Sequence, residues 1–166
     1  MATITLQGAP IHTSGELPKA GTTAPAFTLV DGKLNDVSLA SFKGKKKILS
    51  IVPSLDTPVC AVSTQRFDEY AQKNPGTVVI IVSADLPFAQ SRFCESAKTT
   101  RVVTLSMMRN RHFATDYGVL IQDGPLAGIT ARAVAVLDGD DRILYTELVP
   151  EIAQEPNYQA AIAALK

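Results

Sequence analysis

The stretch KKKILSIVPSLDTPVC, residues 45–60, joins the signal for a strand to the signal for a helix start. Residues 45–52 end in a mostly apolar run, which is typical of a strand that is covered on both faces. Pro53 ends this strand, because proline cannot donate a hydrogen bond to a sheet. Pro58 lies where a helix can begin, since the first helical residue has no use for its N–H. The stretch therefore predicts a buried strand followed directly by a helix.

The same alternation of strands and helices continues along the chain. TVVIIVSA (77–84) is the clearest buried strand, and residues 131–149 are predicted to form a hairpin around a Gly/Asp turn. Further strands are predicted at 3–7, 26–30 and 102–106, with 11–13 pairing back on 3–7, and helices at 58–73, 87–98, 109–117 and 156–165. This order favours an α/β fold that has a central mixed sheet, helices on both faces and an N-terminal β-hairpin.

Length and charge limit the classes of function. Residues 1–166 are expected to form one domain, since a chain of this length can bury a sizeable core without a disulfide or a metal. Sixteen basic and sixteen acidic residues cancel, which predicts no nucleic-acid partner and no stable membrane association. Residues 43–47 are expected to form a solvated turn. Without a leader-like or membrane-spanning segment, the expected location is cytoplasmic.

Cys60 has a position that suits a nucleophile. If Thr57 is the N-cap and Pro58 the first helical residue, Cys60 lies in the first helical turn. The N–H groups there lack intrahelical partners, and the helix dipole favours a thiolate over a thiol. The Thr57 hydroxyl can cap the helix or face the sulfur, and Pro53 could shield the thiolate from water. The alternative that stays open is an inert buried cysteine packing beside Phe67.

Arg132 supplies an independent observation, because it lies within ARAVAVL (131–137), which is otherwise apolar. An unpaired guanidinium would be costly to bury in such a strand, so Arg132 needs an anionic partner. That partner is either a carboxylate, such as Asp56 or Glu69, or the thiolate of Cys60. Only the second pairing would make Arg132 part of a reactive site.

Cys94, the other cysteine, is expected on an exposed and polar face of the helix at 87–98. Gln90 shares this face, whereas Phe88 and Phe93 lie elsewhere. A structural cysteine should be among the buried residues, so an accessible one favours a chemical role, and a chance surface cysteine is the alternative that stays open. One activated and one accessible thiol allow oxidation of the first to a sulfenic acid and its capture by the second as a disulfide.

Other cysteine chemistries fit the sequence less well. An acyl-transfer enzyme needs a histidine beside its nucleophile. The chain has only His12, in the predicted hairpin, and His112, beside Arg109 and Arg111, and both are expected to face solvent. A thioredoxin-type reductase would carry a Cys-x-x-Cys motif, which is absent. A redox-sensing protein that uses the same fold remains an alternative.

Several segments together resemble one family. PSLDTPVC (53–60) has the pattern Pro-x-x-x-Thr-x-x-Cys and resembles the active-site loop of peroxiredoxins. The rest of the chain is similar to the thiol peroxidase subfamily, at SADLPFAQSRFC (83–94), the pair Arg109-Asn110, YGVLIQDGPLAGITARAVAVLD (117–138) and EIAQEPNY (151–158). The likeness extends over nearly the whole chain.

The resemblance implies a thioredoxin-like fold, a homodimer, and an intramolecular disulfide between Cys60 and Cys94 that thioredoxin reduces. It implies that Cys60 is the peroxidatic residue and Cys94 the resolving one. Thr57 and Arg132 would hold the peroxide and the thiolate, with Pro53 covering them. The implied substrates are hydrogen peroxide and organic hydroperoxides, including those of lipids, with no cofactor or metal. The nearest alternative enzyme is a bacterioferritin-comigratory type of peroxiredoxin, whose resolving cysteine usually lies much nearer the first.

Overall fold

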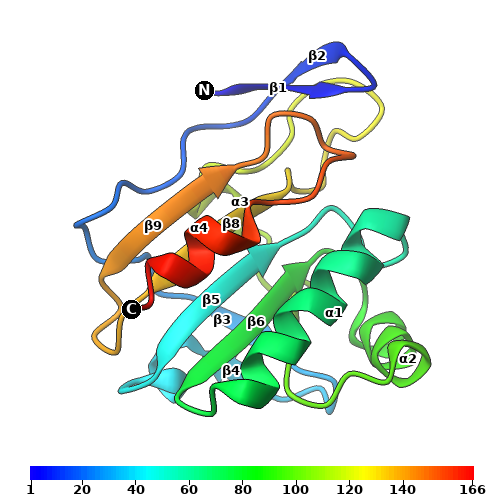
Figure 1. Cartoon of the computed structure of the whole chain (residues 1–166). Helices are drawn as coiled ribbons and strands as arrows, with labels where there is room; N and C mark the ends of the chain where they lie inside the picture. Colours follow the sequence, from blue (N-terminus) through cyan, green and yellow to red (C-terminus); the bar gives the residue numbers. More distant parts are fainter.

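A mixed seven-stranded sheet lies at the centre of the computed structural model, which describes residues 1–166 (Figure 1). The strand order is β4-β3-β7-β6-β5-β8-β9. Neighbours β5, β6 and β7 run parallel, and the remaining pairs are antiparallel. The strands are β3 (Thr28–Val30), β4 (Asp36–Ser38), β5 (Lys46–Ile51), β6 (Thr77–Ser83), β7 (Val103–Ser106), β8 (Ala133–Leu137) and β9 (Ile143–Leu148). The predicted mixed sheet is confirmed, although β4 was not predicted.

Helices cover both faces of this sheet, as predicted. Along β5, Ile48 packs with α1 and α4, while its neighbour Leu49 belongs to the cluster on the opposite face, with Phe113 of α3. This division follows from the alternation of side chains along a strand. The helices are α1 (Pro58–Lys73), α2 (Pro87–Ala97), α3 (His112–Asp116) and α4 (Tyr158–Ala163), with a short 3₁₀ helix η1 (Leu39–Phe42) after β4.

The predicted N-terminal hairpin is present, and it consists of β1 (Thr3–Leu6) and β2 (Ala9–His12). Gln7 and Gly8 form the turn, with φ of 51° and 81°. Two consecutive positive φ values are those of the turn type that matches the twist of paired strands. Ile4 and Ile11 point into the same core as the central strands. The hairpin is therefore fastened to the body of the protein by apolar packing.

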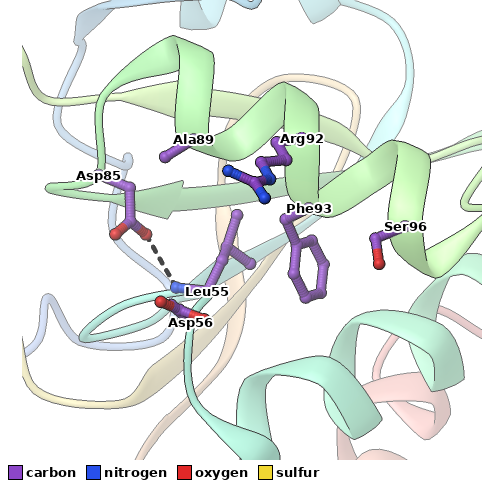
Figure 2. Close-up of a pocket in the computed structure, with 7 residues that line it drawn as sticks. All are labelled: Leu55, Asp56, Asp85, Ala89, Arg92, Phe93 and Ser96. Atoms are coloured by element: carbon purple, nitrogen blue, oxygen red, sulfur yellow. Dashed lines mark hydrogen bonds between the residues drawn. The ribbon is translucent and has the colours of Figure 1, made fainter.

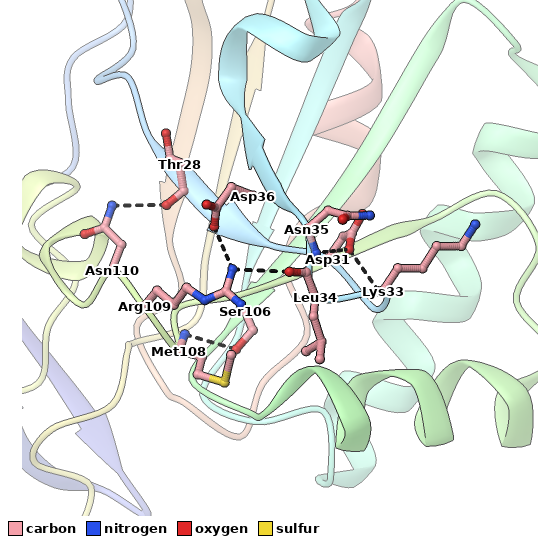
Figure 3. Close-up of polar contacts among 10 residues, drawn as sticks. All are labelled: Thr28, Asp31, Lys33, Leu34, Asn35, Asp36, Ser106, Met108, Arg109 and Asn110. Carbon is pink, nitrogen blue, oxygen red and sulfur yellow. Dashed lines mark hydrogen bonds and ion pairs between the residues drawn. The ribbon is translucent and has the colours of Figure 1, made fainter.

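The third helix begins at His112, so the predicted start at residue 109 is wrong. Arg109 and Asn110 instead fasten the chain after β7 to the β3–β4 edge (Figure 3). Arg109 Nη1 donates to a carboxylate oxygen of Asp36 at 2.9 Å and to the Leu34 carbonyl at 3.2 Å, and the Asn110 amide donates to the Thr28 carbonyl at 3.3 Å. These side chains thus have a structural function at the sheet edge.

Lys47 contradicts the predicted solvated turn at 43–47, because its side chain is fully buried at the start of β5. Its Nζ pairs with the carboxylate of Asp141 and donates to the carbonyl of Asp138 at 3.3 Å. These partners come from the β8–β9 turn, which explains how the charge is accommodated. The C-terminal helix is also shorter than predicted and spans Tyr158–Ala163.

Candidate active site

Cys60 lies in the first turn of α1, as the sequence predicts. Thr57 is the N-cap residue and Pro58 the first helical residue. The hydrogen bond nearest this helix end runs from the Ala61 N–H to the Thr57 carbonyl, at 3.2 Å. The N–H groups of Val59 and Cys60 precede it and have no intrahelical partner. A negative charge on the sulfur would therefore lie at the positive end of the helix dipole.

The alternative prediction, that Cys60 is a buried residue packed beside Phe67, is also confirmed in part, since Cys60 is fully buried. It belongs to the same cluster as Phe67 and Ala71 of α1. The sulfur nevertheless has a polar partner, because Arg132 Nη1 donates to Sγ at 3.0 Å. Cys60 is therefore both a core residue and the acceptor of a charged hydrogen bond, and the second property distinguishes it from an inert thiol.

Arg132 lies immediately before β8 and is only 4% exposed. Its Nε donates to the Ile152 carbonyl at 2.8 Å, which holds the guanidinium in one orientation toward the sulfur. Neither Asp56 nor Glu69 forms an ion pair with it. The carboxylate alternative is therefore wrong for this structure. The Ile152 carbonyl is a further site group, and no signal in the sequence pointed to it.

Thr57 and Pro53 lie in the loop that precedes Cys60. The Thr57 hydroxyl does not cap the helix, and instead donates to the Ser54 carbonyl at 3.1 Å. This bond folds the loop onto itself and leaves the oxygen of the hydroxyl available as an acceptor. Pro53 is buried two residues after the end of β5. The loop that contains Pro53 and Thr57 thus leads directly to Cys60 in the first turn of α1, as the short spacing of these residues in the sequence requires.

Asp85 holds this loop in place, and sequence reasoning missed it. One of its carboxylate oxygens accepts the Ser54 hydroxyl at 2.8 Å, and the other accepts the Leu55 N–H at 2.8 Å and the Ser83 hydroxyl at 2.7 Å. Asp85 follows the carboxyl end of the parallel strand β6. Functional groups gather at such strand ends in α/β sheets, and this signal could have found it.

A cavity of about 450 Å³ separates the loop from α2 (Figure 2). Leu55 and Phe93 give it an apolar part, while Arg92 and Asp85 give it charged groups. Figure 2 shows the Asp85 carboxylate bonded to the Leu55 N–H at one end of the row of lining side chains. The complete lining is Leu55, Asp56, Asp85, Ala89, Arg92, Phe93 and Ser96.

Cys94 lies on α2, half-buried and free, with no disulfide to Cys60. The prediction that Gln90 shares an exposed polar face with Cys94 is wrong, because Gln90 is fully buried. Phe88 is 64% exposed instead. The Gln90 amide donates to the Ser83 hydroxyl and to the Leu105 carbonyl, both at 3.0 Å. A buried amide is stable where such partners satisfy its donors. Gln90 therefore anchors α2 to the ends of β6 and β7.

Neither histidine contacts the candidate nucleophile. His12 Nδ1 lies 2.6 Å from a carboxylate oxygen of Asp123, and His112 is exposed. The hydrogen bond to the Cys60 sulfur comes from Arg132 alone. The arrangement for histidine-assisted acyl transfer is thus not present. The structure contains no cluster of three or more histidine, cysteine and carboxylate side chains that could hold a metal ion.

None of the helices combines the length and the apolar character that crossing a bilayer requires.

The family model described as Redoxin matches residues 19–162, which is most of the chain. The chain belongs to the redoxin family. Thiol peroxidases of Mycobacterium tuberculosis (strain H37Rv) and Mycobacterium bovis are 56% identical to it over 165 residues, which cover 99% of each chain. This redoxin is therefore an oxidoreductase of the peroxiredoxin type that reduces peroxide at the expense of a thiol.

Solved structures support the same assignment of the fold. A peroxiredoxin-like protein from Aquifex aeolicus matches this redoxin with a TM-score of 0.92 and 40% identity, over 99% of this chain and 96% of that one. A thiol peroxidase from Chromobacterium violaceum matches with a TM-score of 0.91 and 24% identity, over 98% and 94%. The predicted thioredoxin-like fold is confirmed.

Proposed function

We propose that this redoxin reduces hydroperoxides through a Cys60 sulfenic acid and a Cys60–Cys94 disulfide, and that thioredoxin restores the dithiol. The observation that carries the proposal is the hydrogen bond of 3.0 Å from buried Arg132 to the sulfur of Cys60. A redox-sensing role would use the same residues but would not need turnover. The 56% identity to thiol peroxidases over nearly the full chain favours turnover. It also favours this subfamily over the bacterioferritin-comigratory alternative.

The proposed chemistry has two steps on the protein. In the first, the Cys60 thiolate attacks the terminal oxygen of ROOH, so that an S–O bond forms, the O–O bond breaks, and the alkoxide leaves and takes a proton to become ROH. In the second, the Cys94 thiolate attacks the sulfur of the Cys60 sulfenic acid. The S–S bond forms, and hydroxide leaves as water with the proton that Cys94 gave up. A dithiol of thioredoxin then reduces the disulfide.

Ionisation alone is too small an effect to explain peroxidase rates. An ordinary thiol is already a few per cent ionised at pH 7, so complete ionisation gains at most about thirtyfold. Enzymes usually accelerate their reactions about a millionfold or more. The larger share must come from donors that stabilise the departing oxygen as its charge develops. Arg132 and the N–H groups of Val59 and Cys60 are the proposed donors. The Thr57 hydroxyl, whose proton is donated to the Ser54 carbonyl, is proposed to accept a hydrogen bond from the peroxide.

Burial of Cys60 makes motion part of the mechanism. The residue is fully buried, so a peroxide reaches the sulfur only when the cover over it shifts. We assign that cover to Pro53 and to the loop ending at Thr57. A disulfide further requires Cα atoms about 4.4–6.8 Å apart. Both thiols are free, with Cys60 buried in the first turn of α1 and Cys94 in the third turn of α2. We infer that the first turn of α1, the α2 segment around Cys94, or both unwind before Cys94 captures the sulfenic acid.

The cavity beside the loop supports organic hydroperoxides as substrates along with hydrogen peroxide. Leu55 and Phe93 offer apolar contact to an alkyl group.

The hairpin residues Ile4 and Ile11 share a core with the central sheet, which supports residues 1–166 as one domain. A cytoplasmic location stays a prediction from the sequence.

A homodimer is the proposed assembly. Leu86 and Phe88 are 52% and 64% exposed at the start of α2. Leu86 also lines an apolar hollow of about 290 Å³ together with Met107, Met108 and Leu120. Exposed apolar side chains beside an apolar hollow mark a protein contact surface. The formal net charge of zero leaves little repulsion between two copies.

Coupled turnover tests the proposed function. With NADPH, thioredoxin reductase and thioredoxin, the protein is expected to consume NADPH continuously on addition of hydrogen peroxide or cumene hydroperoxide. Protein alkylated on its cysteines serves as the control and is expected to be inactive. Oxidation that stops after one equivalent, while thioredoxin stays reduced and in excess, would favour the redox-sensing alternative.

A further inference from the structure

Asp68, in the middle of α1, accepts an unusual set of backbone donors although it is only 4% exposed. The N–H of Arg101 lies 2.7 Å from one carboxylate oxygen, and the N–H of Val102 lies 3.0 Å from the same oxygen. The N–H of Thr100 lies 3.2 Å from both oxygens. The Gln72 side chain donates a further bond, at 2.8 Å. The helix that carries Cys60 is thereby bonded to residues 100–102.

Residues 100–102 directly follow the end of α2. The helix stops at Lys98, which adopts the left-handed conformation with φ of 56°. The carbonyl of Cys94 accepts the N–H of Lys98, and also the N–H of Thr99 at 3.2 Å. These bonds close the last turn of α2, in the manner of a helix C-cap. The anchored segment therefore begins one residue after the cap that includes Cys94.

The hydrogen bonds to the Asp68 carboxylate favour its ionised form. Burial raises the pKa of Asp68, but the backbone hydrogen bonds from Arg101, Thr100 and Val102 and the side-chain bond from Gln72 outweigh it, so the pKa lies below its ordinary value. Hydrogen bonds to a carboxylate are stronger than those to a neutral acceptor. The far end of α2 is independently held, because Gln90 bonds to Ser83 and Leu105.

We propose that Asp68 is a positioning residue that keeps the last turn of α2 folded and thereby limits the rate at which Cys94 captures oxidised Cys60. The inference rests on the proposed disulfide cycle. It takes the case in which the α2 segment around Cys94 unwinds, so that every bond that holds this turn closed slows capture. During that delay a second peroxide can oxidise the sulfenic acid to a sulfinic acid. Asp68 thus sets the balance between disulfide formation and overoxidation.

Asp68→Asn tests the anchor, because it keeps the shape of the side chain and removes the charge. After one equivalent of peroxide, we expect disulfide formation about tenfold faster than in the wild type, with an unchanged rate of Cys60 oxidation. Less sulfinic acid should form in excess peroxide. Hydrogen exchange of the reduced protein should be faster at residues 94–98. Asp68→Glu, a milder change that keeps the charge, should give an intermediate rate of capture.

Gln72→Ala is the matched control, since it removes a bond to the same carboxylate without touching residues 100–102. It should capture at the wild-type rate. Capture in Asp68→Asn that is no faster than in the wild type, or equal acceleration in both variants, would overturn the anchor. Failure of the wild type to form the Cys60–Cys94 disulfide would instead overturn the proposed function. In that case the exchange at residues 94–98 alone decides the anchor, and an unchanged rate rejects it.

Discussion

Arg132→Met is expected to slow the oxidation of Cys60 about 100- to 1,000-fold, even at a pH where the thiol is fully ionised. Arg132 is buried, its Nη1 donates to the Cys60 sulfur at 3.0 Å, and its Nε is held by the Ile152 carbonyl. A donor fixed in this way costs little reorganisation when negative charge moves onto the leaving oxygen. Methionine has a comparable length but no donor.

The measurement is the second-order rate of peroxide reduction by stopped flow, corrected for the thiolate fraction found from an ultraviolet pH titration. Cys60→Ser gives the background rate. Arg101→Met is a matched control, because the Arg101 side chain is exposed and has no hydrogen bond to the sulfur. Equal rates in Arg132→Met and wild type after the correction would mean that Arg132 acts only by favouring the thiolate.

Cys94→Ser is expected to stop steady-state turnover with thioredoxin while leaving the first oxidation intact. The serine hydroxyl cannot capture the sulfenic acid on Cys60, so the reaction should end after about one equivalent of peroxide. NADPH consumption coupled through thioredoxin and its reductase measures both phases. Glu95→Ala, an exposed neighbour on α2, should keep wild-type turnover. Sustained wild-type turnover in Cys94→Ser would exclude Cys94 as the resolving residue.

The parts of the fold that were predicted correctly depend on local signals. The apolar run of β5, the break at Pro53 and the proline at position 58 lie within one short stretch, and the structure places strand and helix there. The sequence limited the partner of Arg132 to a carboxylate or the Cys60 thiolate, because a buried guanidinium needs an anion. Geometry then chose the sulfur over the carboxylates.

The parts that were missed depend on partners far along the chain. Gln90 looks like a surface residue until Ser83 and Leu105 are seen to satisfy its amide. Asp68 is an ordinary helix carboxylate in sequence, and its value as an anchor comes from backbone N–H groups more than thirty positions away. Backbone donors leave no trace in residue type, so only the folded structure could identify these contacts.

Peptide mass spectrometry after stoichiometric oxidation is the sharpest test of the proposed Cys60–Cys94 disulfide. Reduced protein is treated with one equivalent of hydrogen peroxide, alkylated at free thiols and digested without reductant. We expect the peptides that contain Cys60 and Cys94 to be linked by a disulfide, with neither cysteine alkylated, and the undigested oxidised protein to migrate as a single chain on a non-reducing denaturing gel. Oxidised Cys60 beside a fully alkylated Cys94 would contradict it, and so would a disulfide that joins two chains.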